Sequence, residues 1–543
     1  MKIRNAIIIL VALVLANVLV HRFILRWDLT DDKRYSISPA TQQLLQSLDK
    51  PLEIAILLDG ELNPSFTRLK TATGELLEEL NVYAGKSIAV VEPNNIEHVV
   101  KEHNLDSIVI FERTHKGQMV QTTIYPYAIV KYGDKQAIVK LLKKQPGLTA
   151  EEQLNYSIET LEYEFVEAIR RLKQTKVEKI AFLEGHGELK ERDVYELSKA
   201  LSHYYQIDRG VLGLESGVLD EYKAVIIADP IREFSEEDKY ILDQYLMQGG
   251  CILWIVNGVR FSQEYLSSEG TTPIIALDLN INDMLFRYGV RVNPSLVQDL
   301  NCKSITVDVS QTPDQPNWQS MPWTYAPLLL PSRASVITKN IALVHSIFAS
   351  PIDLVGGNDG IKKQILLATS TASKFTGVPT EVNLSYGVDN EESYKYANIP
   401  VAVSLEGEFT SLYAYLPPPE RVKQHAPMLK KSTKTRQIVV SASSTVRNQW
   451  YQGQSLPLGY DMDTGIQYGN CDFMVNAVLY LTGNDSWMEL RDKTITLRLL
   501  NNQRAIKART TAQVVSIVIP LLVLGLTGGI MLIIRRKKHI RKS

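Results

Sequence analysis

The chain has very little cysteine and none of the common motifs for nucleotide hydrolysis. Its three cysteines, Cys251, Cys302 and Cys471, lie far apart and form no CxxC pair, so they predict neither a zinc site nor a disulfide framework. Whether two of them pair outside the cytoplasm stays open in the sequence. The chain also lacks GxxxxGKS/T, HExxH and a GxGxxG placed between a strand and a helix. Any ATP hydrolysis that energises its function must therefore come from another chain.

An excess of charge of one sign is missing as well. The 543 residues include 59 Lys and Arg against 60 Asp and Glu, which is unlike the basic composition typical of nucleic-acid binding. A hydrophobic fraction of 45% with 22% charged residues is typical of a folded protein. We therefore expect no nucleic-acid partner, and we look for a membrane signal in single segments. Two such segments stand out, one near each end of the chain.

The first apolar segment covers residues 6–20, with Asn17 as its one polar side chain, and continues to residue 25. This length reaches the roughly 20 residues that a transmembrane helix needs. Trp27 follows at the position of an interfacial ring. A signal peptide cleaved after Ala16 is the alternative, but the apolar residues continue beyond that site. We therefore expect residues 1–27 to form a transmembrane helix and its flank.

The second apolar segment, predicted as a transmembrane helix at residues 511–534, has few polar side chains, namely Gln513, Ser516 and Thr527. The tail at residues 535–543 carries six basic residues, and the positive-inside rule places such a tail in the cytoplasm. Because two spans return the chain to its starting side, both termini are expected in the cytoplasm. Residues 28–510 are then expected in the periplasm of a bacterium with two membranes, and the protein in its inner membrane.

Residues 28–147 predict a mixed α/β domain. A helix is expected from Pro39 with Ser38 as its N-cap. Further strands and one long helix are expected at residues 52–60, 66–83, 87–93, 107–112, 120–131 and 136–142. A connecting helix at residues 148–176 opens with a capping box and has one apolar face, formed by Leu154, Ile158, Leu161, Phe165 and Ile169. We expect this helix to couple the domain to the rest of the outer region.

Residues 177–510 predict a doubly wound α/β domain with insertions. Strands and helices alternate at residues 177–183, 191–204, 224–230, 235–250 and 251–258, which indicates a parallel sheet with helices on both faces. Ser235 is the predicted N-cap of the second helix, and Gly249 and Gly250 end it. Later segments add strands near 365–370 and 436–443 and an exposed loop at 417–435.

The stretch FLEGHGELKE at residues 182–191 carries the candidate site. Glu184, His186 and Glu188 follow a predicted strand, and ligands gather at the carboxyl ends of strands in doubly wound sheets. No Ser or Cys stands beside them in a GxSxG arrangement, and the flanking glycines suit a tight turn. We interpret the stretch as a structural turn. Its three polar residues remain candidates for contact with a ligand or partner, and catalysis is a further alternative.

Two other positions resemble sites. Asp461 and Asp463 resemble the start of a calcium loop, but a third oxygen ligand and the distal glutamate are missing. We therefore predict a surface turn there and expect neither a metal nor a cofactor. Cys251 opens a strand, which favours a buried apolar role over that of a nucleophile.

Several stretches together resemble one family. They are RWDLTDDKRYSISPAT, FTRLKTATGELLEEL, FLEGHGEL, LPLGYDMDTGIQYGNCDFMVNAVLYLTG and LRDKTITLRLLN, in this order between the two apolar segments. The chain resembles the gliding-motility ABC-transporter auxiliary proteins, the GldG-like family, over nearly its whole length. The resemblance implies a two-span subunit whose outer part includes a flavodoxin-like, class I amidotransferase-like domain. It also implies an auxiliary or substrate-binding role beside a separate permease and a separate ATPase.

The family supplies no catalytic residues, and at one place the chain departs from it. Residues 439–448 read VVSASSTVRN, where a strand end with glycine and aspartate is expected, so a ligand role for that loop is in doubt. Our leading hypothesis is a non-enzymatic, membrane-anchored auxiliary subunit of an ABC transporter with an unidentified cargo. A membrane-tethered enzyme that uses the turn of His186 and a docking platform for envelope proteins are the alternatives.

Overall fold

The computed structural model describes residues 37–484 with short gaps, and seven further residues between 518 and 529. The gaps lie at residues 61, 92–95, 104, 114–118, 144–148, 174–176, 309, 311–316, 340, 357–359 and 385–390. The predicted first span and the basic tail lie outside the described residues. Seven positions of the predicted second span are described, and all of them are helical. Among the residues that the structure describes, no helix combines the length and the apolar character that crossing a bilayer requires.

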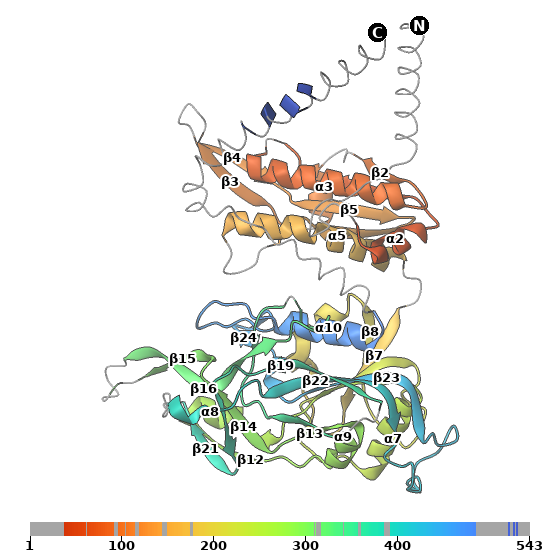
Figure 1. Cartoon of the computed structure of the whole chain (residues 1–543), viewed down its shortest axis with the longest axis vertical. Coiled ribbons are helices and arrows are strands. Elements are labelled where there is room, and N and C mark those ends of the chain that lie inside the picture. The colour runs from red at the N-terminus through yellow and green to blue at the C-terminus, as the bar shows by residue number, and fades with distance from the viewer. Residues whose placement is uncertain are drawn as a thin grey trace, which may run out of the picture. The chain divides into compact units, whose positions relative to one another are not determined.

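The N-terminal part is built around a four-stranded sheet with the order β2-β1-β5-β6. Strand β1 pairs in parallel with β2 and antiparallel with β5. Helices α3 and α5 pack against each other, and α5 also packs on β5 and β6 (Figure 1). The element bounds are α2 Pro39–Gln46, β1 Leu52–Ile56, α3 Pro64–Tyr83, β2 Ile88–Val91, α4 Ile96–Glu102, β3 Ile108–Arg113, β4 Met119–Ile124, β5 Tyr127–Tyr132, β6 Lys135–Lys140 and α5 Ala150–Lys173.

The predicted caps of this part are confirmed. The side chain of Ser38 accepts a hydrogen bond from the backbone N–H of Thr41 at 3.1 Å. At the start of α5, the amide of Thr149 donates to the Glu152 carboxylate at 2.8 Å and the amide of Glu152 donates to the Thr149 hydroxyl at 3.3 Å, which is the capping box that the sequence predicts. The expected apolar face of α5 is buried at Leu154, Leu161, Phe165 and Ile169.

A buried carboxylate ties the start of the described chain to α5. The Glu162 side chain is largely buried. It accepts hydrogen bonds from the amide of Ser38 and the hydroxyl of Thr41, both at 2.8 Å. Burying a carboxylate is costly unless it is hydrogen-bonded, and these two donors offset that cost. The first helix is therefore fixed to α5 by specific polar contacts as well as by the apolar core.

Residues 178–484 contain a ten-stranded sheet in which the order β15-β16-β19-β22-β23-β10-β9-β7-β8 forms the main path and β17 pairs with β16. Five strands, β8, β7, β9, β10 and β23, are parallel to one another. The other strands of the path pair antiparallel. The strand bounds are β7 Glu178–Glu184, β8 Tyr205–Val211, β9 Tyr222–Ala228, β10 Cys251–Ile255, β15 Cys302–Asp308, β16 Trp318–Pro331, β17 Val344–His345, β19 Lys362–Ala368, β22 Pro400–Thr410 and β23 Lys431–Val440.

The central strands β9 and β10 are mostly apolar and buried because both faces of the sheet are covered there. Within β9, Ala224 and Ile226 face one core cluster and Val225 and Ile227 face the other, as the period of two requires. The first cluster includes residues of α6 Tyr195–Leu201 and α10 Asn470–Leu481, and the second includes residues of α7 Glu236–Met247 and α9 Asn282–Tyr288. Figure 1 shows α10 on one side of the sheet and α7 and α9 on the other. The predicted helices on both faces are confirmed.

The remaining elements form small sheets around this core. They are β11 Val259–Arg260, α8 Gln263–Glu269, β12 Thr271–Ala276, β13 Val290–Val292, β14 Ser295–Asp299, β18 Ile352–Leu354, β20 Ser373–Gly377, β21 Thr380–Asn383, β24 Trp450–Tyr451 and β25 Gln454–Ser455. Strand β12 pairs with β11 and β21, β13 with β18, β14 with β20, and β24 with β25. A separate apolar cluster around Trp323 and Phe348 includes residues of β11, α8, β12, β14 and β21.

Three details of the sequence prediction were wrong. The single strand expected at residues 120–131 is two strands, β4 and β5, separated by Tyr125 and Pro126, because proline cannot continue the ladder of hydrogen bonds. The exposed loop expected at 417–435 ends earlier, since β23 begins at Lys431. The large sheet is mixed rather than parallel throughout, because β22, β19, β16 and β15 follow one another as antiparallel neighbours.

The close approach of two backbones after β10 gives a test of this packing. A Cβ atom on Gly258 would lie 2.3 Å from the carbonyl oxygen of Asn293, whereas one on Gly213 would meet no atom within 4 Å. We expect Gly258→Ala to destabilise the protein by about 1–3 kcal/mol, the usual cost of overpacking. Gly213→Ala is the control and should change little. Thermal unfolding of the full chain measures both, and equal midpoints for the two variants would contradict this packing.

Candidate functional site

The loop after β7 brings two of the three predicted site residues together. The Nδ1 atom of His186 lies 3.0 Å from Glu188 Oε1, and the His186 amide donates to Glu188 Oε2 at 2.7 Å. The Nε2 atom lies 3.2 Å from Oδ2 of Asp238, in the first turn of α7. The imidazole is also stacked on the ring of Phe234, with centroids 3.7 Å apart. The site is therefore a cluster of His186, Glu188, Asp238 and Phe234.

The electrostatics of this cluster favour a charged imidazole. Burial by itself would lower the pKa of His186, but hydrogen bonds to Asp238 and Glu188 outweigh it and raise this pKa to about 9. The side chain of Glu188 is 1% exposed and that of His186 is 8% exposed. Burial would raise the pKa of Asp238, yet the contacts with His186 and Ser235 lower it. At neutral pH both ring nitrogens carry protons, so neither offers the lone pair that a general base needs.

Glu184, the third predicted residue, lies outside the cluster. Its carboxylate accepts a hydrogen bond from Arg209 Nε at 2.8 Å. Arg209 also donates to the carbonyl of Leu189 at 2.8 Å and lies over the ring of Phe182. Glu184 therefore helps to hold β8 and the end of the loop in place. The structure separates it from His186 and Glu188, which the sequence spacing alone had grouped with it.

Backbone contacts fasten the same loop to the loop after β9. The carbonyl of His186 accepts from the amides of Ile231 and Arg232, both at 2.9 Å, and the amide of Leu189 donates to the carbonyl of Ala228 at 2.9 Å. The glycines that flank His186 have φ values of 122° and 78°, which only glycine adopts without strain. The sequence signal for Ser235 as an N-cap is confirmed, since it accepts from the amide of Asp238 at 3.1 Å. Nothing in the sequence linked Asp238 or Phe234 to His186.

A second polar group ties the ends of further strands together. Asp229, directly after β9, has a φ of 56°, and burial raises the pKa of its carboxyl group. Its carboxylate lies 3.2 Å from Nη2 of Arg447. After β10, the amide group of Asn257 exchanges two hydrogen bonds with Ser443, at 2.8 and 2.9 Å. The stretch at 439–448, where the sequence departs from the resembled family, therefore supplies polar partners to two neighbouring strand ends.

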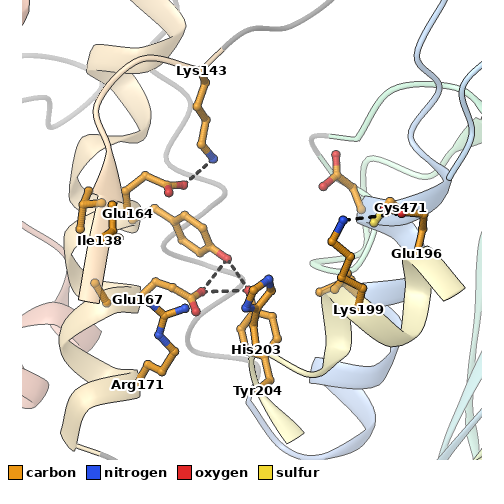
Figure 2. Close-up of a pocket in the computed structure, with 16 residues that line it drawn as sticks. Ile138, Lys143, Glu164, Glu167, Arg171, Glu196, Lys199, His203, Tyr204 and Cys471 are labelled. Atoms are coloured by element: carbon orange, nitrogen blue, oxygen red, sulfur yellow. Dashed lines mark hydrogen bonds and ion pairs between the residues drawn. The ribbon is translucent and has the colours of Figure 1, made fainter. Parts of the chain in front are cut away.

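A cleft of about 420 Å³ lies between α5 with β6 on one wall and α6 with α10 on the other (Figure 2). Its lining combines apolar side chains with charged ones of both signs, with Lys143, Arg171 and Lys199 among the bases and Glu164, Glu167, Glu196 and Asp472 among the acids. Across it, the hydroxyl of Tyr204 donates to Glu167 Oε2 at 2.9 Å. Burial, together with nearby Arg171, lowers the pKa of His203 in the wall.

The two aspartates that resembled a calcium loop hold a lysine. Nζ of Lys303 lies 2.5 Å from Oδ1 of Asp461 and 3.3 Å from Oδ2 of Asp463. The Asp461 side chain is 2% exposed, and it also accepts from the hydroxyl of Thr464 at 2.6 Å. A tethered ammonium group therefore occupies the place that a cation would take. Among the described residues, no group of three or more His, Cys, Asp or Glu side chains could hold a metal ion.

The three cysteines are free thiols. Cys251 is buried at the start of β10, as the sequence predicts, and burial raises the pKa of Cys302 to about 11. A thiol with so high a pKa carries very little of the reactive thiolate at neutral pH. Neither Cys251 nor Cys302 therefore has the character of an activated nucleophile.

Comparison with known proteins matches two family models. The first, described as an ABC-type uncharacterized transport system, matches residues 178–477, which is more than half of the chain. The second, described as a domain of unknown function, matches residues 31–131. No curated protein matches the sequence.

Three solved structures are similar to the chain at low scores. The N-terminal domain of mmIFT52 has a TM-score of 0.32 at 17% identity, with 56% of this chain and 97% of that chain covered. A thua-like protein from Parabacteroides merdae has a TM-score of 0.27 at 8% identity, covering 57% and 91%. An exo-beta-1,4-mannosidase from Opitutaceae bacterium strain TAV5 has a TM-score of 0.20 at 12% identity, covering 84% and 56%. All three scores are too low to carry an argument.

The raised pKa of His186 predicts a specific dependence of stability on pH. Because the folded state binds this proton more tightly than the unfolded state, the stabilisation is complete below about pH 6.5 and is lost as the pH rises through about 9. The shift of about 2.5 units corresponds to roughly 3 kcal/mol. His186→Gln should remove this part of the pH profile, and the exposed His98→Gln should not. Thermal unfolding between pH 6 and 10 measures the effect, and identical profiles for wild type and His186→Gln would contradict it.

The contact of Lys303 with Asp461 predicts that calcium plays no part at this turn. Lys303→Met leaves a buried carboxylate without its counter-charge, so we expect a loss of about 3–5 kcal/mol. Adding Asp461→Asn to this variant should restore part of the loss, and Lys362→Met on the surface is the matched control. Neither millimolar calcium nor a chelator should change the unfolding midpoint of the wild type. A calcium-dependent rise of that midpoint would show that the lysine does not fill the site.

Proposed function

We propose that this chain, which belongs to the ABC-type transport system auxiliary family, acts as a non-catalytic, membrane-anchored subunit of an ABC transporter. The observation that carries the proposal is the family match over residues 178–477. Because the sequence holds no P-loop motif, a separate ATPase supplies the energy and a separate permease supplies the path. The anchoring rests on the two apolar segments at residues 6–25 and 511–534. Both termini then lie in the cytoplasm and the large outer region in the periplasm.

The outer region is proposed to contain three parts: a mixed α/β domain at 28–147, a connecting helix at 148–176, and a flavodoxin-like domain at 177–510. The order of the parallel strands, β8-β7-β9-β10-β23, supports the third part, because numbering these strands along the chain gives the flavodoxin order 2-1-3-4-5. The apolar core of residues 37–172 supports a first part with its own core, and that core also takes in residues of the helix at 148–176. A link to gliding motility rests on the resemblance alone.

The geometry at the ends of the strands supports an auxiliary role over catalysis. In the flavodoxin order, ligands bind at the crevice between the first and third strands, here β7 and β9. The loops that would line this crevice are bonded to each other, and the stacked rings of His186 and Phe234 lie between them. An enzyme that used Glu184, His186 and Glu188 would need a ring nitrogen free for proton transfer, and both are engaged with carboxylates.

The cleft of Figure 2 supports cargo binding as the task of the outer region. Its volume lies within the usual range of ligand pockets, and its walls offer both acidic and basic groups. A ligand that carries both signs of charge would find partners on each wall. A docking platform without a small ligand is the second candidate, and it would use exposed apolar side chains in place of the cleft.

Purification of the full chain from its native membranes in mild detergent tests the proposed role. We expect a permease and a P-loop ATPase to co-purify with it in fixed proportion. His186→Gln is the informative variant, since an auxiliary subunit should retain both partners and its transport activity. Repeated recovery of the chain without either partner would contradict the proposal. So would substrate turnover by the purified chain alone that is lost in His186→Gln.

A further inference from the structure

The loop that joins β22 to β23, residues 411–430, is held at both ends by α7. Oδ2 of Asp243 accepts from the hydroxyl of Ser411 at 2.7 Å, and its Oδ1 accepts from the amide of Leu412 at 2.8 Å. At the other end, Gln244 accepts from the amide of Leu429 at 2.7 Å and donates to the carbonyl of Leu429 at 3.0 Å. Two adjacent helical residues therefore clamp the two ends of one loop, which we call the clamped loop.

The clamp uses a fully buried carboxylate. Asp243 is 0% exposed, and burial raises its pKa. Besides its two loop donors, it accepts from the hydroxyl of Tyr288 at 2.8 Å and from the side-chain amide of Gln244 at 3.0 Å. A buried carboxylate without donors is strongly destabilising, so these four hydrogen bonds are what makes the arrangement stable. They also fix the positions at which the loop leaves and re-enters the fold.

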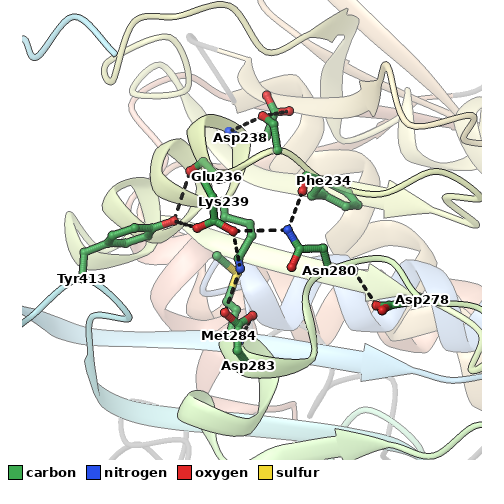
Figure 3. Close-up of polar contacts among 10 residues, drawn as sticks. Phe234, Glu236, Asp238, Lys239, Asp278, Asn280, Asp283, Met284 and Tyr413 are labelled. Carbon is green, nitrogen blue, oxygen red and sulfur yellow. Dashed lines mark hydrogen bonds and ion pairs between the residues drawn. The ribbon is translucent and has the colours of Figure 1, made fainter. Parts of the chain in front are cut away.

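A second contact holds the first turn of the clamped loop. The hydroxyl of Tyr413 donates to the carbonyl and to Oε2 of Glu236, at 3.1 and 3.0 Å (Figure 3). Glu236 also pairs with Lys239 at 3.0 Å, and Lys239, which is 1% exposed, lies 2.7 Å from Asp283 on α9. The ring of Tyr413 packs edge-on against Tyr240. Helices α7 and α9 thus form a stiff base under this end of the loop.

The return half of the clamped loop is bonded to residues 214–216. The amide of Lys423 donates to the carbonyl of Leu214 at 2.8 Å, and the amide of Ser216 donates back to Lys423 at 3.0 Å. The amide of His425 donates to the hydroxyl of Ser216 at 3.0 Å. The clamped loop is therefore fixed at both ends by α7 and in its return half by residues 214–216.

Its tip nevertheless exposes apolar side chains. Tyr415 is 88% exposed, the largest value among the large apolar side chains that the structure describes, and Leu416 is 53% exposed. Three prolines follow at 417–419, and consecutive prolines favour the extended polyproline II conformation, which carries no internal hydrogen bonds. A rigid tip of this kind loses little conformational entropy when it binds.

Two basic side chains follow the prolines, and each is more exposed to solvent than the acidic side chain with which it pairs. The side chain of Arg421 is 74% exposed against 18% for its partner Glu237, and that of Lys423 is 78% exposed against 50% for Glu215. Ion pairs this exposed are weak because water and salt screen them, so the two bases can exchange these partners for others at little cost. The clamped loop carries three basic side chains, Arg421, Lys423 and Lys430, against one acid, Glu420, so its own charge is positive.

We propose that the clamped loop is a recognition element for a protein partner that has an aromatic-lined groove bordered by acidic side chains. Tyr415, Leu416 and the three prolines enter the groove, as proline-rich ligands do, and Arg421 and Lys423 pair with the acidic border. A protein fits these features better than an anionic bilayer. Membrane binding scales with the apolar area buried, and the two exposed apolar side chains of the tip, Tyr415 and Leu416, bury little area.

Photo-crosslinking in native membranes tests the proposal on the full chain. A benzophenone amino acid replaces Tyr415 in one variant and Tyr451, which is 51% exposed, in the control. We expect an adduct with one other protein at position 415 and none at position 451. The crosslinked peptide of that protein should be rich in aromatic and acidic residues. Arg421→Glu with Lys423→Glu should reduce the yield several-fold, and added salt should also reduce it.

Once that protein is purified, Tyr415→Ala should weaken its binding about tenfold or more, as loss of a buried aromatic anchor does. Unchanged thermal unfolding of the variant shows that the fold is intact. Adducts to lipid, to a second copy of this chain, or in equal yield at both positions would overturn the proposal. So would the absence of any adduct at position 415. These outcomes are independent of whether a permease and an ATPase co-purify.

Discussion

A protonated histidine held between two carboxylates is the contact on which the functional interpretation depends. His186 joins Glu188 in its own loop to Asp238 in the first turn of α7, and its backbone carbonyl takes two amides from the loop after β9. The charge on the ring is stabilised by both carboxylates at once, so removing the proton would weaken two contacts together. The cluster therefore keeps the two loops closed against each other at neutral pH.

The contacts between the loops after β7 and β9 bear on where this sheet could bind a ligand. In the proposed flavodoxin order, ligands bind where the strand order reverses, and here the loops after β7 and β9 at that position are bonded to each other. The proposed function therefore relies on the cleft beside α5 and α6 and on loops that project from the sheet. Helix α7 contacts both the His186 cluster and the clamped loop. Its first turn binds His186 through Asp238, and its last turns bind the loop between β22 and β23.

The sequence predicted those features that depend on neighbouring residues. The caps at Ser38 and Ser235, the capping box at Thr149 and the strands β7, β9 and β10 all follow from local patterns, and the structure confirms them. Strand β8, with the sequence YQIDRGV, was not predicted. Partners distant in the chain were not predictable, because nothing in the sequence of α7 marks Asp238 as the partner of His186. The same holds for Lys303 and Asp461, which are far apart in sequence and meet through the fold. The short distance in sequence grouped Glu184 with His186. In the structure, Glu184 is the last residue of β7, and its side chain pairs with Arg209 instead.

The charge state of His186 is the most direct test of the central claim. Nitrogen-15 chemical shifts of the imidazole in the full chain, labelled at histidine and assigned with His186→Gln, report whether each ring nitrogen carries a proton. A ring clamped between Glu188 and Asp238 should have both nitrogens protonated from pH 6 to 8 and should titrate near pH 9. A neutral ring at pH 7.5 with one unprotonated nitrogen would contradict the closed cluster and reopen the strand ends as a site for chemistry.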